Sequence, residues 1–167
     1  MDARRMLSTL TDALGRGSRR ALDGARHGAA AVAGRRDEET VAGPLLDVSR
    51  VDADEALFLV RTMIAAAAAD GVVDASERDR LHGAMREAGL DPDDRSFLDD
   101  EIAWPRDIEE IADAVQTPER AARTYAAARL VIEPDTMQER EFLRLLAERM
   151  DLTPDEVAAI EARAGGR

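Results

Sequence analysis

The fold is decided by RTMIAAAAADGVVDASERDRLHGAMREAGLDPD at residues 61–93, because RTYAAARLVIEPDTMQEREFLRLLAERMDLTPD at residues 123–155 repeats it after a gap-free shift of 62 positions. The two segments are identical at 10 of 33 positions, including Arg-Thr at the start and Leu-x-Pro-Asp at the end. Self-similarity at a fixed period is typical of a duplicated supersecondary unit. We therefore expect two helix–turn–helix units that pack as pseudo-symmetric halves of one bundle.

Outside the repeats, apolar residues also recur at helical spacing. Leu57, Val60 and Ile64 share one face of a helix that leads into the first repeat. Hydrophobic residues make up 45% of the chain, but aromatic residues only 3%, which favours packed helices over a sheet. The fold class is therefore all-α, a compact bundle of about seven helices. The predicted helices span about 52–69, 75–88, 91–102, 108–115, 117–132, 137–150 and 153–164.

Charge divides the chain into a basic arm and an acidic body. Residues 1–36 hold eight Arg and three Asp, whereas residues 37–167 carry a net charge of −17. We predict a weakly helical or disordered arm at 1–36, a linker at 37–50 and the helical domain at 51–164. Three interpretations of the arm stay open: disorder, packing against the acidic body, or an interfacial helix that meets anionic lipid. In the third, the residues facing lipid are Met6, Leu7, Leu10 and Leu14.

Composition and motifs also exclude several function classes. An acidic body repels nucleic acid and attracts cations or basic partners, so no nucleic-acid partner is expected. No membrane-spanning stretch or export signal is present, which predicts a cytoplasmic protein, peripheral to the inner membrane if the arm binds lipid. The chain has no cysteine, and His27 and His82 lack a neighbouring nucleophile or second histidine. We predict that the protein is not an enzyme.

Carboxylates gather at the turn of each repeat, around a glycine in the first and a proline in the second. Carboxylate oxygens are the ligands that Ca²⁺ and Mg²⁺ prefer, so either ion is a candidate although no cofactor is certain. Helix capping is the alternative, because Asp74 with Glu77 and Thr136 with Glu139 have the spacing of a capping box. The two interpretations are compatible, since a capping carboxylate keeps free lone pairs. The candidate metal ligands are Asp70, Asp74, Glu77, Glu133, Asp135 and Glu139.

A further run of carboxylates lies between the repeats, at Asp91, Asp93 and Asp94 and at 99–101. Such a run forms either a solvated face or a docking surface for a basic partner. Trp104 follows it at the end of a predicted helix, and Tyr125 lies within the fifth helix. We predict that both aromatic side chains anchor the packing of the bundle.

Two motifs resemble a known family. AADGVVDASER at 68–78 resembles the first helix–turn–helix signature of the TerB-like family, which is named for a tellurite-resistance protein. The stretch from Tyr125 to Leu143 is similar to the YebE-like branch, bacterial proteins often described as inner-membrane proteins. The resemblance covers about 52–162 and implies a helical bundle whose acidic clusters bind divalent cations within membrane-linked stress complexes. Ile132 stands where the first repeat has Asp70, so an ion site in both repeats is not implied.

Together these observations lead to two hypotheses of different class. The first is a non-enzymatic, TerB-like binding or regulatory module, with divalent-cation binding and a link to metal or envelope stress implied by the resemblance. The alternative is a structural or adaptor protein whose acidic surface docks an unknown protein partner while the basic arm touches the membrane surface.

Overall fold

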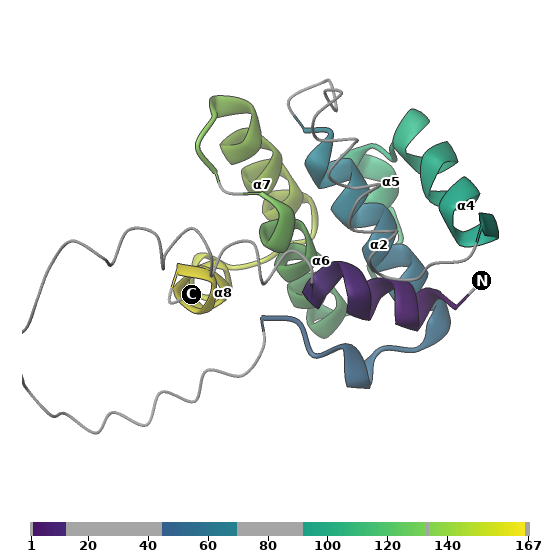
Figure 1. The fold of residues 1–167 in the computed structure, drawn as a ribbon. Helices are drawn as coiled ribbons and strands as arrows, with labels where there is room; N and C mark the ends of the chain where they lie inside the picture. The colour runs from purple at the N-terminus through teal and green to yellow at the C-terminus, as the bar shows by residue number, and fades with distance from the viewer. Residues whose placement is uncertain (1, 13–44, 70–91, 133, 166–167) are drawn as a thin grey trace, which may run out of the picture.

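The structure, a computed structural model, describes residues 2–12, 45–69, 92–132 and 134–165 of the 167-residue chain. This part of the chain is helical and contains no strand, which confirms the all-α prediction (Figure 1). A helix at residues 3–12 opens the chain. The later helices are η2 (Val48–Arg50), α2 (Ala53–Ala67), α4 (Pro92–Ala103), α5 (Ile108–Asp113), α6 (Pro118–Val131), α7 (Met137–Arg149) and α8 (Pro154–Gly165).

Local capping explains why these helices begin where the sequence predicts. The side chain of Asp52 accepts a hydrogen bond from the backbone N–H of Glu55 at 2.8 Å and so caps α2. Thr117 caps α6 ahead of Pro118, which occupies the first turn, where its missing N–H breaks no helical bond. Asp107 forms a complete capping box at the start of α5. These caps satisfy backbone donors that a helix start otherwise leaves without a partner.

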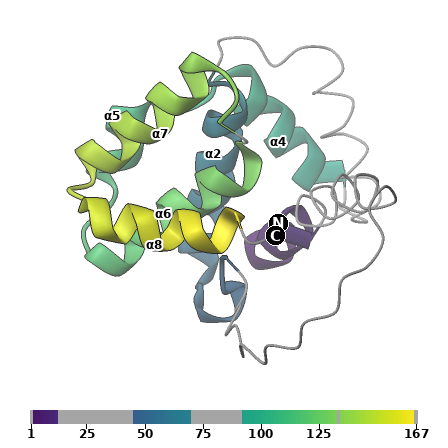
Figure 2. The same cartoon turned by 90° about the vertical axis from the view of Figure 1, so that its left-hand side faces the viewer.

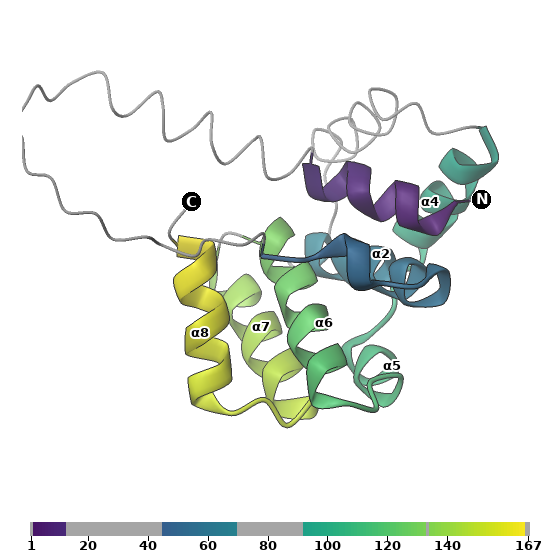
Figure 3. The ribbon, with the colours of Figure 1, turned by 90° about the horizontal axis from the view of Figure 1, so that it is seen from below.

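The duplication is visible in the arrangement of the helices. A shift of 62 residues carries α4 onto α8 and places α2 over α6. The two copies of the first helix, α2 and α6, pack against each other more extensively than any other described pair. α4 packs on α2, and α8 correspondingly packs on α6. Figure 3 shows α6, α7 and α8 standing side by side, and α5 lies against α7 (Figure 2).

Equivalent residues make equivalent contacts in the two halves. Thr62 and Thr124, which the 62-residue shift superposes, are both fully buried. The hydroxyl of Thr62 donates to the carbonyl of Phe58 at 3.1 Å, and that of Thr124 donates to the carbonyl of Arg120 at 2.7 Å. Each hydroxyl thus bonds one turn back along its own helix, which satisfies a buried polar group without a partner from another helix.

Three ion pairs tie α2 and α6 to neighbouring helices. In each, an arginine Nε lies 2.7 Å from a glutamate oxygen, and both side chains are at least two-thirds buried. Partial burial reduces solvent screening but also removes hydration from both charges, so loss of one partner costs more here than at the surface. The pairs are Arg61–Glu101 between α2 and α4, Arg123–Glu55 between α6 and α2, and Arg129–Glu161 between α6 and α8.

The described part of the arm is an integral helix of the fold. Met6 and Leu7 are fully buried and Leu10 is 4% exposed, and all three belong to a core cluster with α2 and α4 residues. Figure 3 shows this helix, in purple, alongside α2. Of the three interpretations of the arm, packing against the body therefore holds for residues 3–12. The lipid-facing role of Met6, Leu7 and Leu10 is wrong, because their apolar stripe is buried in the core instead. Leu14 and the rest of 13–36 lie outside the described residues.

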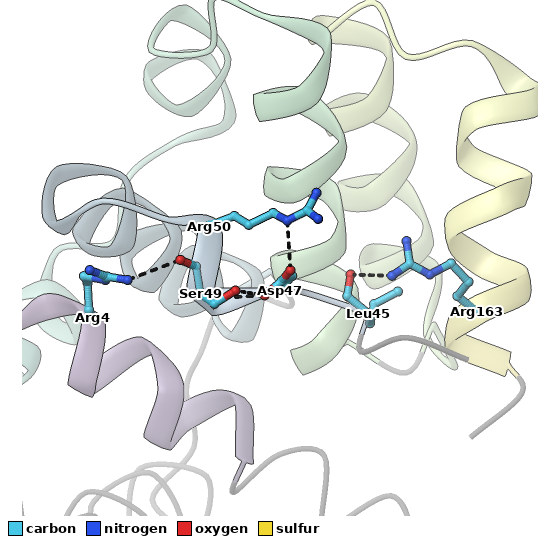
Figure 4. A network of polar contacts seen from close by, with 6 residues as sticks. All are labelled: Arg4, Leu45, Asp47, Ser49, Arg50 and Arg163. Carbon is cyan, nitrogen blue, oxygen red and sulfur yellow. Dashed lines mark hydrogen bonds and ion pairs between the residues drawn. The ribbon is translucent and has the colours of Figure 1, made fainter. Parts of the chain in front are cut away.

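The end of the predicted linker also belongs to the core. Leu45 and Leu46 are 4% and 2% exposed and contribute to the two different core clusters. On one side, the Arg4 guanidinium donates to the carbonyl of Ser49 at 3.3 Å. On the other, Arg163 of α8 donates to the carbonyl of Leu45 at 3.5 Å (Figure 4). Residues 45–51 therefore connect the N-terminal helix to α8, a role that the linker interpretation missed.

Candidate interaction surface at Trp104

Most of the predicted metal ligands cannot be located in the structure. Asp70, Asp74, Glu77 and Glu133 lie outside the described residues. Of the remaining two, Asp135 is exposed and Glu139 is half-buried at the start of α7. Among the residues that are described, no group of three or more potential ligands is placed to hold a metal ion. Cation binding at the acidic turns therefore stays a prediction.

The capping interpretation is confirmed at the second turn. Glu139 Oε2 accepts from both the backbone N–H and the hydroxyl of Thr136 at 2.9 Å, and Thr136 Oγ1 accepts from the Glu139 N–H at 3.2 Å. The backbone carbonyl of Asp135 accepts from the Arg140 guanidinium at 2.9 Å. One carboxylate oxygen of Glu139 is thus occupied by capping, as the spacing of Thr136 and Glu139 predicts.

The two large amphipathic aromatic residues differ in their surroundings. Tyr125 is 3% exposed and packs in the core, as predicted. Trp104 is 84% exposed, so its predicted role as a packing anchor is wrong. The backbone N–H of Trp104 donates to the carbonyl of Asp100 at 3.1 Å, which extends the helical geometry of α4 by one residue. Pro105 then prevents the helix from continuing, and the indole is left on the surface between α4 and α5.

Two exposed acids lie close to this tryptophan in the chain. Asp100 lies four residues before Trp104 and so on the same face of the helix end, and it is exposed. Asp107, the N-cap of α5, lies three residues after Trp104 and is exposed as well. We call Asp100, Trp104, Pro105 and Asp107 the Trp104 face. An exposed indole between carboxylates can stack on a guanidinium while the acids neutralise its charge.

The charges at this helix end are unfavourable for the fold itself. The last turn of α4 contains Asp100 and Glu101 and no basic residue, although a helix C-terminus carries partial negative charge. Glu101 is compensated, because it pairs with Arg61 at 2.7 Å, and the Arg61 guanidinium also lies 5.3 Å from the centre of the Phe97 ring. The exposed charge of Asp100 disfavours the end of α4, so this acid does not stabilise the helix.

An apolar groove adjoins the Trp104 face. Its volume is about 410 Å³, and it lies between the end of α2, the start of α5 and one side of α7. We call it the α2–α5–α7 groove. Pro105 and Asp107 line it and so belong to both surfaces. At its rim, Arg149 of α7 pairs with Glu109 of α5 at 3.1 Å, and both side chains are more than half exposed.

A second groove, of about 510 Å³, lies between α6, α7 and α8. At its wall the Tyr125 hydroxyl donates to Glu161 Oε1 at 2.9 Å, and Arg129 Nε lies 2.7 Å from Glu161 Oε2. Burial, and then the bond to Glu161, raise the pKa of Tyr125 well above its ordinary value. A phenol held this firmly in its protonated form is not tuned for acid–base chemistry near neutral pH, which indicates a structural network.

Sequence reasoning missed the exposure of Trp104, although a signal was present. A tryptophan followed directly by proline stands at a helix end, and acids at the preceding positions of the same face indicate solvent.

None of the helices in the part of the chain that the structure describes has the length and hydropathy needed to cross a bilayer.

The sequence of the chain is similar to a known family and to one curated protein. A family model described as "Protein of unknown function (DUF533)" matches residues 7–164, from within the N-terminal helix to the end of α8. An "Uncharacterized protein in ampR 5'region" of Yersinia enterocolitica is 29% identical over 103 residues, which cover 62% of this chain and 74% of the relative. No solved structure gave a significant match.

Proposed function

The chain belongs to the family described as proteins of unknown function (DUF533), and from this premise we propose that it is a non-enzymatic binding module that docks a cationic segment of a partner protein. The observation that carries the proposal is the 84% exposure of Trp104 on a face flanked by carboxylates. Large aromatic residues are normally buried, and at interfaces tryptophan is a preferred anchor.

Electrostatics supports the choice of a cationic partner. Residues 92–113, which form α4, α5 and their connection, contain nine acids and two arginines. Asp94 is buried, and Glu101 and Glu109 are paired with Arg61 and Arg149, which leaves six other acids in this stretch. Such a surface attracts basic segments and repels nucleic acid. Asp100 and Trp104 lie on one helix face, so one arginine of a partner can pair with the carboxylate and stack on the indole together.

The TerB-like resemblance of AADGVVDASER at 68–78 supports a second function, divalent-cation binding at Asp70, Asp74 and Glu77. The YebE-like character of the second repeat and a link to metal or envelope stress belong to the same proposal. Contact with anionic membrane would fall to residues 13–36, because the apolar residues of 3–12 are buried in the core.

The docking proposal is tested by fluorescence, because Trp104 is the only tryptophan of the chain. Titration with an arginine-rich peptide is expected to shift or quench the emission of Trp104, and raised salt is expected to weaken the effect. A matched peptide with citrulline in place of arginine keeps the shape and removes the charge. Equal responses to the two peptides, or no response to either, would refute docking of a cationic segment at this face.

Asp100→Asn separates binding from stability. We expect the affinity for the arginine-rich peptide to fall by about two- to five-fold, the range of an exposed ion pair. We also expect the variant to be more stable, by about 0.3–1 kcal/mol, because it removes a negative charge from the C-terminus of α4. Asp155→Asn in the first turn of α8 is the matched control, which should lose a little stability and no affinity. A stabilised Asp100→Asn with unchanged affinity would remove Asp100 from the docking face.

A further inference from the structure

Building on the proposed docking function, we propose that the partner segment is an amphipathic helix. Its arginines contact the Trp104 face, and one large apolar side chain enters the α2–α5–α7 groove. The proposal rests on the position of the groove, because Pro105, which directly follows Trp104 in the chain, lines it. One bound segment therefore reaches both.

The groove itself fits an apolar side chain. Its apolar lining comes from Ala65 of α2, from Ala68 and Ala69 just after α2, from Ile108 of α5, and from Phe142 and Leu145 of α7. Its volume of about 410 Å³ is within the range of about 300–1,000 Å³ that is usual for binding pockets. Small alanine side chains on one wall leave space that larger residues would fill.

The charged groups around the groove do not compete for a cation. Arg149 is already paired with Glu109, and Arg106 offsets the charge of Asp107. Asp100 is therefore the acid of the Trp104 face that lies outside the groove. The excess of carboxylates lies instead on α4 and α5, beside Trp104. The two surfaces therefore select different groups, an apolar side chain in the groove and a guanidinium at Trp104. An amphipathic helix with arginine and leucine three or four positions apart presents both on one side and binds in an apolar groove.

The test compares three synthetic helical peptides on the full chain, with Trp104 emission as the readout. The first carries arginine and leucine on one face, the second has serine in place of leucine, and the third has citrulline in place of arginine. Burial of one leucine predicts that the serine peptide binds about ten-fold more weakly or worse. The citrulline peptide reports on the proposed docking function alone. If only the citrulline exchange weakens binding, cationic docking stands and the amphipathic helix is overturned.

Variants of the protein locate the apolar contact. Leu145→Gln makes the groove polar, and Met137→Gln is its control, because Met137 is 76% exposed on the same helix and does not line the groove. Leu145→Gln should weaken binding of the leucine peptide about ten-fold and leave the affinity for the serine peptide unchanged. Ala68→Phe, which fills the groove, should have the same effect. It provides a second test if Leu145→Gln does not fold. Equal effects on both peptides would overturn the assignment.

The same measurements exclude other occupants. Trp104 emission that changes with protein concentration in the absence of peptide would show that a second copy covers the face, and would overturn the proposal. Emission of the free protein that changes with salt would assign the face to the arginines of residues 13–36 of this chain, with the same consequence. Emission independent of both, together with the leucine-dependent affinity, supports an amphipathic partner helix.

Discussion

Replacement of Leu7 by alanine tests whether the N-terminal helix is part of the folded core. Leu7 is fully buried in the cluster that includes Leu59, Val60 and Leu98. Removal of three buried side-chain carbons destabilises a protein by about 2–5 kcal/mol when the cavity cannot collapse. For a domain of this size, each kcal/mol lowers the Tm by about 2–4 °C, so a loss of about 3 kcal/mol predicts a decrease of about 6–12 °C.

The assay is urea and thermal unfolding of the full chain, followed by circular dichroism, without lipid. Met137→Ala is the control, because it also removes side-chain carbons from a helix but at a position that is 76% exposed. It should change the free energy of unfolding by less than about 0.5 kcal/mol. A Leu7→Ala variant as stable as this control would refute the integral helix and restore the interpretation of residues 3–12 as an arm. A large loss of stability without lipid present would confirm that Leu7 serves the core.

Three further predictions follow from other parts of the chain. Glu55→Gln should destabilise the protein by about 1–3 kcal/mol in denaturant unfolding, because it leaves the guanidinium of Arg123 without its charge partner across the α2–α6 contact. In an alkaline absorbance titration, Tyr125, the only tyrosine, should ionise well above its ordinary pKa of 10.0. Since its pKa is raised on folding, this stabilisation is complete below about pH 10 and is lost as the pH rises further. Saturation with Ca²⁺ or Mg²⁺ at about 100-fold over the Kd should raise the Tm by about 4 °C or more, and Asp70→Ala with Glu77→Ala should abolish the shift.

Each of these has its own control. Asp54→Asn changes an exposed acid in the first turn of the same helix and should have a much smaller effect than Glu55→Gln. Ionisation of the tyrosine near its ordinary pKa in the folded protein would contradict the Tyr125–Glu161 hydrogen bond. A melt that is the same in EDTA and in millimolar Ca²⁺ or Mg²⁺ would leave the first acidic turn as a helix cap.

The helices of the bundle were predictable because their signals are local. Thr117 ahead of Pro118 marks the start of α6, and the Thr136–Glu139 spacing predicts the capping box that begins α7. The equivalence of the two repeats was also readable, since Arg-Thr at 61–62 and at 123–124 marks two buried helices. For the caps, the residues that decide the structure lie within one helical turn of each other, and the repeat is read from the chain without knowing how its two copies pack.

The candidate surface was predictable only in part. The run of carboxylates at 99–101 identified an acidic face, but the sequence could not separate a solvated face from a docking surface. The groove beside it is formed by residues of α2, α5 and α7, which are far apart in the chain. Their meeting depends on how the helices pack, and no local pattern reports that geometry.

The sequence by itself determined the described helices and their caps, because capping and apolar periodicity act over neighbouring residues. The duplication is read by comparing two segments of the chain, and the predicted helix at 75–88 within it lies outside the described residues. Only the tertiary structure decided what covers each apolar face and which large side chain stays outside. Met6 and Leu7 could face lipid or protein equally well, and packing against α2 and α4 places them in the core. Trp104 is exposed because no described helix packs over the end of α4. Burial is a property of contacts between distant segments, so it follows from the packed fold and not from the pattern of any one helix.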